Sequence, residues 1–206
     1  MRLEGLYVIT DSDRRDPIET AQRVLEGGAR ILQLRDKHAT TRQLVRWGQE
    51  LRALTRRYEA LLILNDRLDV ALAVEADGVH LGQDDLPATQ ARKLAGEKFI
   101  IGVSAETVEE ARHAEADGAN YLGVGPMFAT ATKPDAGEPV GPERLRAIKQ
   151  AVSIPVFGIG GITLENAHAV LDAGADGICV ISAILAAPNP KVVTQQFLRL
   201  LATRGL

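Results

Sequence analysis

The chain has 206 residues, of which 46% are hydrophobic and 25% charged, an ordinary composition for a globular protein. Its formal net charge of −3 gives no support for a general affinity for nucleic acid or for anionic membranes, so any anion site must be local. The single cysteine, Cys179, cannot form an intramolecular disulfide, and its apolar neighbours predict a buried small side chain. No apolar stretch approaches the ~20 residues of a membrane span, and we expect a cytoplasmic protein.

Short apolar runs alternate with amphipathic stretches along the whole chain. The runs are rich in Val, Ile and Leu and alternate poorly, which is typical of strands buried on both faces. We expect strands at residues 6–10, 31–35, 61–65, 78–80, 99–103, 121–125, 156–158 and 177–181. Helical periodicity is found at residues 20–25, 43–57, 67–74, 89–94, 107–116, 143–152, 164–173 and 192–201. Eight strands alternating with eight helices predict a parallel sheet.

This alternation predicts an α/β fold with one domain over residues 1–206, a single-domain (β/α)8 TIM barrel with short loops. Such barrels usually need ~250 residues, so the loops here must be minimal. The alternative is an open doubly wound sheet, which normally has a glycine-rich loop after its first strand. Here Thr10-Asp11-Ser12-Asp13 follows the first strand, and the glycine-rich segment follows the seventh, which favours the barrel.

Three aspartates lie where a helix passes into the next strand. Asp77, Asp117 and Asp176 each stand beside a glycine in a short turn, and glycine suits the left-handed cap after a helix. We expect them on the amino-terminal face of the barrel, where residues serve stability. They are interpreted as turn and cap residues.

Polar residues gather at the opposite, carboxyl ends of the expected strands, where barrel active sites lie. The candidates in chain order are Gln33, Arg35, Asp36, Lys37, Asn65, Asp66, His80, Asp84, Asp85, Ser104, Thr130, Thr132, Lys133 and Ser182. The four histidines, among them His113 and His168 inside expected helices, show no ligand spacing. No Ser–His–acid arrangement or reactive cysteine emerges, so the chemistry indicated is charge stabilisation around a polyanion.

The segment Gly158-Ile159-Gly160-Gly161 is the first of two candidate phosphate sites. Glycines let backbone N–H groups approach a phosphate without interference from a Cβ atom. Ile181 and Ser182 begin the next crossover, where helix-end amides add donors. The alternative is a tight turn without a ligand.

Two aspartates after neighbouring strands are candidate metal ligands. Asp66 and Asp85 can share a hard cation such as Mg²⁺, with phosphate oxygens completing its coordination. Asp84 and Asp36 are rival ligands, and two solvated turn aspartates are the alternative interpretation. Arg35, Lys37 and Lys133 are cations suited to phosphate, and Thr130 and Thr132 lie in a long loop that can close over substrate.

The ordered set of strand-end motifs resembles the thiamine phosphate synthase family over residues 6–184. The motifs are Tyr7-Val8-Ile9-Thr10-Asp11, Gln33-Leu34-Arg35-Asp36-Lys37, Asn65-Asp66, Gly78-Val79-His80-Leu81-Gly82-Gln83-Asp84-Asp85, Gly102-Val103-Ser104-Ala105, Gly125-Pro126, Thr130-Ala131-Thr132-Lys133, Gly158-Ile159-Gly160-Gly161-Ile162 and Ile181-Ser182-Ala183. Single motifs are modest signals, but the full series is specific. The resemblance implies that aminopyrimidine methyl diphosphate and a thiazole phosphate are joined, giving thiamine phosphate and diphosphate by dissociative substitution.

The resemblance also implies roles for residues, position by position. The metal ligands for Mg²⁺ are Asp66 and Asp85. The pyrimidine diphosphate site comprises Gln33, Leu34, Arg35, Asp36, Lys37, Asn65, Ser104 and Lys133, of which Arg35, Ser104 and Lys133 are the expected catalytic residues. The thiazole phosphate site comprises Thr130, Ala131, Thr132, Gly161, Ile181 and Ser182. The partners are then small phosphorylated molecules, neither nucleic acid nor membrane, with a homo-oligomer as a further option.

Two positions depart from the family pattern, and two other functions stay open. Glu106 stands where many members have His, and Ala131 stands where many have Glu. The related thiazole tautomerases use the same barrel with a His in the segment matching Ser104–Glu106, which this chain lacks. A non-catalytic protein that binds phosphate ligands is the more distant alternative. The intact set of cations and carboxylates favours the synthase.

Overall fold

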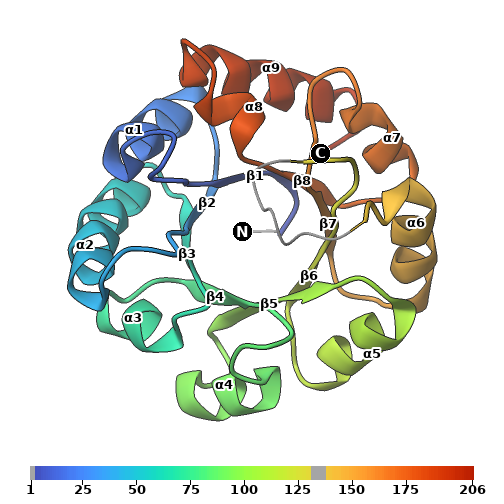
Figure 1. The fold of residues 1–206 in the computed structure, drawn as a ribbon, viewed down its shortest axis with the longest axis horizontal. Helices are drawn as coiled ribbons and strands as arrows, with labels where there is room; N and C mark the ends of the chain where they lie inside the picture. The colour runs from blue at the N-terminus through green and yellow to red at the C-terminus, as the bar shows by residue number, and fades with distance from the viewer. Residues whose placement is uncertain (1–2, 131–137) are drawn as a thin grey trace.

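The computed structural model describes residues 3–130 and 138–206, in which eight parallel strands close into a barrel. Each strand pairs with the next along the chain, and β8 pairs with β1 to close the ring (Figure 1). The strands are β1 (Gly5–Ile9), β2 (Ile31–Leu34), β3 (Leu61–Asn65), β4 (Gly78–Leu81), β5 (Ile100–Ala105), β6 (Tyr121–Val124), β7 (Val156–Ile159) and β8 (Gly177–Val180). The predicted (β/α)8 barrel is confirmed.

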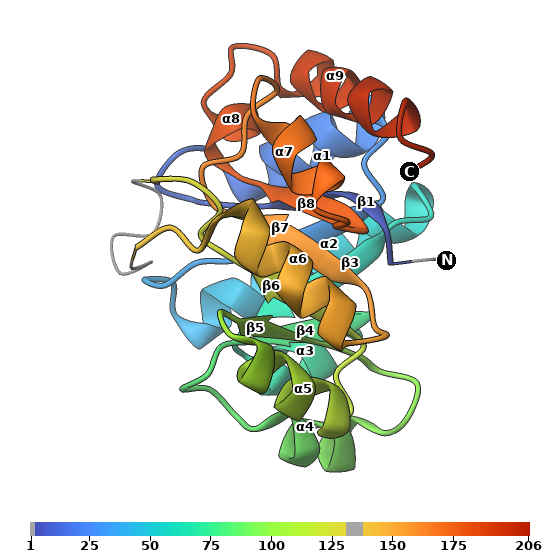
Figure 2. The same cartoon turned by 90° about the vertical axis from the view of Figure 1, so that its right-hand side faces the viewer.

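A ring of helices surrounds the strands, with α4 and α9 on opposite sides of the barrel (Figures 1 and 2). The helices are α1 (Pro17–Gly27), α2 (Thr41–Arg57), α3 (Leu68–Ala73), α4 (Ala88–Ala95), α5 (Val108–Ala116), α6 (Gly141–Ala151), α7 (Ala167–Asp172), α8 (Ser182–Leu185) and α9 (Pro190–Ala202). The last residues of the chain lie at the end of the barrel where the strands begin (Figure 2). Short helix α8 is an addition to the eight helices that the sequence predicts.

Two element boundaries differ from the prediction for local reasons. Strand β5 continues through Ser104 to Ala105, because Ala105 still pairs with Val124 of β6. Helix α7 begins three residues later than expected. Asn166 explains this, since its side chain accepts from Thr163 N at 2.8 Å and donates to Gly161 O at 2.9 Å, holding a turn there.

The apolar core has two layers. The outer layer fills the space between strands and helices with Leu, Ile, Val and Ala side chains. The inner layer lies inside the barrel and consists of Tyr7, Ile9, Ile31, Ile63, Tyr121, Phe157 and Cys179. Its three aromatic rings meet edge to face, with centroids 5.6 to 5.9 Å apart. Cys179 is buried as predicted, and burial raises the pKa of its thiol.

The amino-terminal face carries the structural aspartates that the sequence predicts there. Asp77 accepts two bonds from the Arg52 guanidinium, at 2.7 and 3.1 Å, and one from Leu62 N at 2.8 Å. Asp176 likewise accepts from Lys149 Nζ and Val156 N, both at 2.7 Å. Each carboxylate thus ties an outer helix to the start of a strand, and Asp117 is the C-cap of α5. All three are confirmed as turn and cap residues.

We predict that Asp77→Asn lowers the free energy of unfolding by about 2 kcal/mol, because it weakens a charged, two-pronged contact and a backbone bond. The matched control is Glu75→Gln in the same turn. Glu75 pairs with Arg56 at 2.7 Å, but those side chains are 76% and 57% exposed against 23% and 17% for Asp77 and Arg52. The control should cost less than about 0.5 kcal/mol. Urea unfolding measures both, and equal losses would contradict the structural role of Asp77.

Candidate active site

A cavity of about 430 Å³ opens at the carboxyl ends of the strands. Every strand contributes to its wall, so residues that are far apart in sequence meet there. The predicted site residues that line it are Gln33, Arg35, Lys37, Asn65, Asp66, Asp85, Ser104, Thr130, Gly161, Ile181 and Ser182. Asp84, the rival metal ligand, and Glu106 also lie on its rim.

Two predicted substrate-binding side chains do not line the cavity. Leu34 is buried in the outer apolar layer, because alternation along β2 turns it away from the barrel axis. Asp36 folds back on its own loop, where it accepts from His38 N at 2.7 Å, from Ala39 N at 2.6 Å and from the Ser12 hydroxyl. Burial opposes ionisation of Asp36, but these hydrogen bonds together outweigh it and lower the pKa of the Asp36 carboxyl. Ala131, Thr132 and Lys133 lie outside the described residues.

Arg35 is anchored by its backbone at the mouth of the cavity. Its amide donates to the hydroxyl of Thr10, which is completely buried beyond the end of β1, at 3.1 Å. Within residues 3–130 and 138–206, the Arg35 guanidinium has no hydrogen-bond partner in the protein. An arginine whose backbone is held and whose guanidinium keeps its donors is suited to binding an anionic ligand.

Two carboxylates and one ammonium meet beside Arg35. Asp66 Oδ2 accepts from Lys37 Nζ at 3.2 Å. Asp66 has a φ of 61°, a left-handed conformation that is uncommon for a residue with a side chain, and its amide donates to His80 O at 2.8 Å. Such conformations persist where the surroundings hold them in place, and they concentrate at functional sites.

The second carboxylate, Asp85, is held by its own turn and lies against Asp66. Its Oδ2 accepts from Gly82 N at 2.7 Å. Burial raises the pKa of the Asp85 carboxyl and contact with Asp66 adds to the rise, while the Gly82 bond and Lys37 oppose it. Two negative groups are therefore held closer together than is favourable without a cation.

The donor set around Asp66 and Asp85 fits a hard cation that keeps water or ligand oxygens. Among residues 3–130 and 138–206, no three His, Cys, Asp or Glu side chains gather tightly enough to enclose a metal by themselves. Mg²⁺ is usually held by one or two carboxylates together with substrate phosphates. The repulsion between the two carboxylates is what a divalent ion would relieve.

The opposite wall of the cavity is built from the β7–α7 and β8–α8 turns. Gly160 and Gly161 have φ values of 94° and 66°, and they pack against the loop after β6. A Cβ atom on Gly160 would lie 2.7 Å from Pro126 Cα, and one on Gly161 would lie 2.7 Å from Ala129 O. These glycines therefore have a packing role besides the phosphate approach that the sequence suggests.

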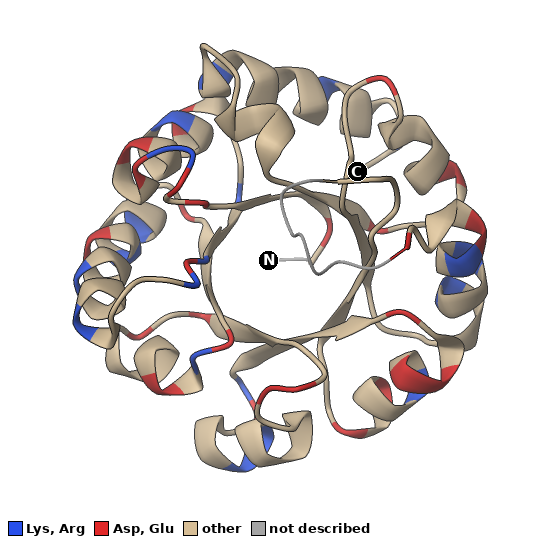
Figure 3. Cartoon of the chain, viewed as in Figure 1, with Lys and Arg blue, Asp and Glu red and all other residues tan. Residues whose placement is uncertain are grey.

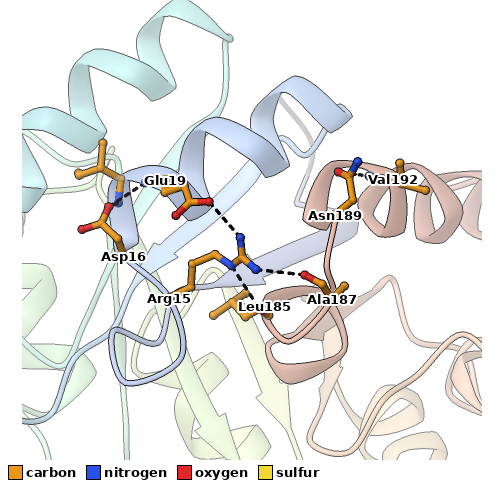
Figure 4. Close-up of polar contacts among 8 residues, drawn as sticks. Arg15, Asp16, Glu19, Leu185, Ala187, Asn189 and Val192 are labelled. Carbon is orange, nitrogen blue, oxygen red and sulfur yellow. Dashed lines mark hydrogen bonds and ion pairs between the residues drawn. The ribbon is translucent and has the colours of Figure 1, made fainter.

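Helix α8 is held against the barrel by an arginine from the loop after β1. Arg15 donates from Nε to Leu185 O at 3.3 Å and from Nη2 to Ala187 O at 3.1 Å (Figure 4). Its third bond, to Glu19 Oε1 at 3.0 Å, fixes the guanidinium. Arg15 thus satisfies two backbone carbonyls at the end of this single turn, and Ser182 at its start lines the cavity.

Sequence reasoning missed the two tyrosines that form the floor of the cavity beside the candidate His80. Tyr7 and Tyr121 point into the barrel, where the two phenol oxygens lie 2.8 Å apart. His80 Nδ1 lies 3.1 Å from Tyr121 Oη, and His80 Nε2 lies 3.0 Å from Ser104 Oγ. Period-two alternation was the available signal, because it places Tyr7 on the same face of β1 as Ile9 and Tyr121 on the same face of β6 as Gly123, both of which line the cavity.

Acidic and basic residues are mixed around the ring of helices in the view of Figure 3, while the strands are mostly uncharged. Within the described ranges, no helix has the length and apolar character that crossing a membrane requires. The charged groups on the cavity wall therefore stand apart as a local site.

Comparison with known proteins now adds to this geometry. A family model described as thiamine monophosphate synthase matches residues 6–184. The chain belongs to the thiamine monophosphate synthase family. The match spans all eight strands and both walls of the cavity, and it confirms the resemblance that the strand-end motifs carry.

Relatives in this family match over nearly the whole chain. A protein of Methanospirillum hungatei named thiamine-phosphate synthase is 54% identical over 94% of this chain and 95% of its own length. One of the same name from Moorella thermoacetica is 55% identical over 97% and 96%. The solved structure titled thiamine phosphate pyrophosphorylase from Pyrococcus furiosus has a TM-score of 0.92 at 46% identity, covering 97% of this chain and 96% of that one.

We predict that Asp85→Asn stabilises the protein in metal-free buffer at pH 7. A carboxyl whose folded pKa is raised stabilises the fold only while protonated, and that contribution is lost as pH rises through the folded pKa. The amide keeps an oxygen for Gly82 and removes the charge. Because solvent screens this partly exposed group, the gain should be about 0.5 kcal/mol by urea unfolding. Asp84→Asn, which changes the exposed neighbour, is the control, and destabilisation by Asp85→Asn alone would contradict the reasoning.

Proposed function

We propose that the chain is a thiamine-phosphate synthase, joining an aminopyrimidine methyl diphosphate to a thiazole phosphate with release of diphosphate. The observation that carries the proposal is one cavity with two walls whose residues suit the binding of anions. The wall after β2 to β5 has cations beside the carboxylate pair, and the wall after β6 to β8 has the glycine turn and the start of α8. The names of the full-length relatives support the same activity.

The leaving diphosphate belongs on the wall that holds Asp66 and Asp85. These two residues would hold a Mg²⁺ ion, which when bound supplies positive charge to the departing diphosphate. Arg35 and Lys37 supply further positive charge from the protein, and Lys133 is proposed to join them. Cleavage of the carbon–oxygen bond leaves its electron pair on diphosphate, so stabilising that anion is the main task of this wall.

The organic parts of the two substrates fit the rest of the cavity. Gln33, Asn65 and Ser104 present amide and hydroxyl groups that can hydrogen-bond an aminopyrimidine. Gly161, Ile181 and Ser182 are proposed to hold the thiazole phosphate, together with Thr130, Ala131 and Thr132. Placing the thiazole nitrogen opposite the pyrimidine methylene makes the joining step effectively unimolecular.

The residues of the cavity explain why no general base is needed. The thiazole nitrogen attacks with its own lone pair and loses no proton, so the protein has only to orient it and to stabilise charge. The apolar wall segments of Ile9, Ile159 and Ile181 keep water away from the electron-poor carbon. A water molecule in place of the thiazole would divert the reaction to hydrolysis.

The related tautomerase activity is less well supported. Glu106 stands on the rim where that branch is expected to have a histidine, and the Glu106 amide donates to Glu110 Oε2 at 2.6 Å in the capping box of α5. An isomerase would also have no use for the carboxylate pair and the cations beside it.

A condensation assay tests the proposal directly. Purified protein with Mg²⁺ and both phosphorylated substrates should give thiamine phosphate and diphosphate in many turnovers per enzyme, detected as thiochrome fluorescence after oxidation. Product below one equivalent per enzyme would contradict the synthase. Isomerisation of the thiazole phosphate without condensation would identify the tautomerase instead.

We predict that Asp66→Asn lowers turnover by at least ~100-fold, because it removes one charge from the metal site. Asparagine tolerates the positive φ at this position, so the fold should be retained. The matched control is Asp69→Asn, which changes the exposed partner of Arg67 three residues further on. Thermal melts with and without Mg²⁺ accompany the assay. Unchanged turnover, or an equal loss in the control, would refute Asp66 as a metal ligand.

A further inference from the structure

Five polar side chains form one continuous chain of hydrogen bonds across the barrel interior. Gln33 Nε2 lies 2.7 Å from Tyr7 Oη, and Tyr7 Oη lies 2.8 Å from Tyr121 Oη. The chain continues through His80, with 3.1 Å to Tyr121 and 3.0 Å to Ser104 Oγ. Both ends, Gln33 and Ser104, line the cavity. We call these five residues the interior relay.

Glycines in strands β5 and β6 leave room for the aromatic rings of this relay. Tyr7 and Tyr121 are buried and pack edge to face with each other and with Phe157. A Cβ atom on Gly102 would lie 2.1 Å from Tyr121 Cζ, and one on Gly123 would lie 3.0 Å from His80 Cε1. Glycine at these two positions leaves the space that the Tyr121 and His80 rings occupy. The relay geometry is therefore fixed by packing.

The number of hydrogen atoms on the two phenols allows the hydrogen bonds of the relay to run in only two directions. Burial raises the pKa of both Tyr7 and Tyr121 well above the usual value, so each phenol keeps its single hydrogen. A buried phenol between two partners must donate to one and accept from the other. All bonds therefore run from Gln33 toward Ser104, or all run the other way.

Gln33, at one end of the relay, decides which of the two directions the hydrogen bonds take. Gln33 Nε2 is a donor only, so Tyr7 Oη accepts from it and donates to Tyr121. Tyr121 in turn donates to His80 Nδ1, which leaves the imidazole hydrogen on Nε2. His80 Nε2 then donates to Ser104 Oγ, so the Ser104 hydroxyl must direct its own hydrogen elsewhere. The cavity that Ser104 lines is the space open to it.

We propose that Tyr7, Tyr121 and His80 are positioning residues that fix His80 as the Nε2–H tautomer and present Ser104 to the substrate as a hydrogen-bond donor. A donor at this position selects a ring-nitrogen acceptor and disfavours an exocyclic amino group at the same place, since two donors would face each other. Assigning that acceptor to the aminopyrimidine rests on the proposed function, whereas the tautomer of His80 is a property of the protein alone.

Nitrogen-15 NMR of histidine-labelled, ligand-free protein tests the direction of the relay without any activity. The His80 signals, assigned by their loss in His80→Gln, should show a protonated Nε2 and an unprotonated Nδ1 at neutral pH. Tyr121→Phe should mix the two tautomers, whereas Tyr58→Phe, the same change in a tyrosine outside the relay, should leave them as in the wild type. A protonated Nδ1 in the wild-type protein would overturn the proposal.

A double-mutant cycle then tests whether the relay acts through Ser104. Tyr121→Phe should lower kcat/KM for the pyrimidine diphosphate about tenfold, the effect of one lost hydrogen bond, and leave KM for the thiazole phosphate unchanged. In a Ser104→Ala background the same change should have no further effect. Additive losses would show a merely structural role and overturn the proposal. If the wild type itself makes no product, the proposed function fails, and the NMR result still decides the relay.

Discussion

Closure of the sheet by the β8–β1 pairing is the constraint on which the rest of the structure depends. Gly5 to Val8 pair with Gly177 to Val180, so every strand has two neighbours and all eight carboxyl ends meet at one mouth. The glycines at this seam are required, because a Cβ atom on Gly177 would lie 2.4 Å from Gly5 O and from Phe157 Cε1. Residues from 7 to 182 share one cavity only because the ring is complete.

The two ends of the barrel use the same residue types in opposite ways. At the amino-terminal end, Asp77 and Asp176 each have a full set of donors and a cation, so their charges stabilise the fold. At the carboxyl end, Asp66 and Asp85 face each other, and among residues 3–130 and 138–206 Lys37 is the cation that pairs with Asp66. Electrostatic strain is thus confined to the mouth, where a ligand can relieve it, which is the usual compromise between stability and activity.

The sequence alone predicts the fold and most of the residues of the cavity wall. It does not predict which way some of the strand side chains point. Buried strands and capped helices are local patterns, so the barrel and residues such as Arg35, Asp66 and Ser182 could be predicted. Leu34 is grouped with its neighbours in the predicted site, but its side chain lies in the outer apolar layer, because a motif treated as a continuous run ignores alternation along a strand. Tyr7 and Tyr121 were missed because their meeting depends on the register around the whole ring, which no local pattern contains.

The inner layer of the barrel is where stability and chemistry are coupled. Barrel interiors are usually filled with branched apolar side chains, and here Ile9, Ile31 and Ile63 follow that rule. Tyr7, Tyr121 and His80 occupy other inward-facing positions, where most barrels have apolar side chains. Polar groups are tolerated there only if each polar atom has a hydrogen-bond partner. Satisfying the last of them requires a group at the cavity surface, and Ser104 is that group. Completing the hydrogen bonds of the core therefore also orients a hydroxyl at the site, and a change in the core should alter substrate recognition without touching the substrate.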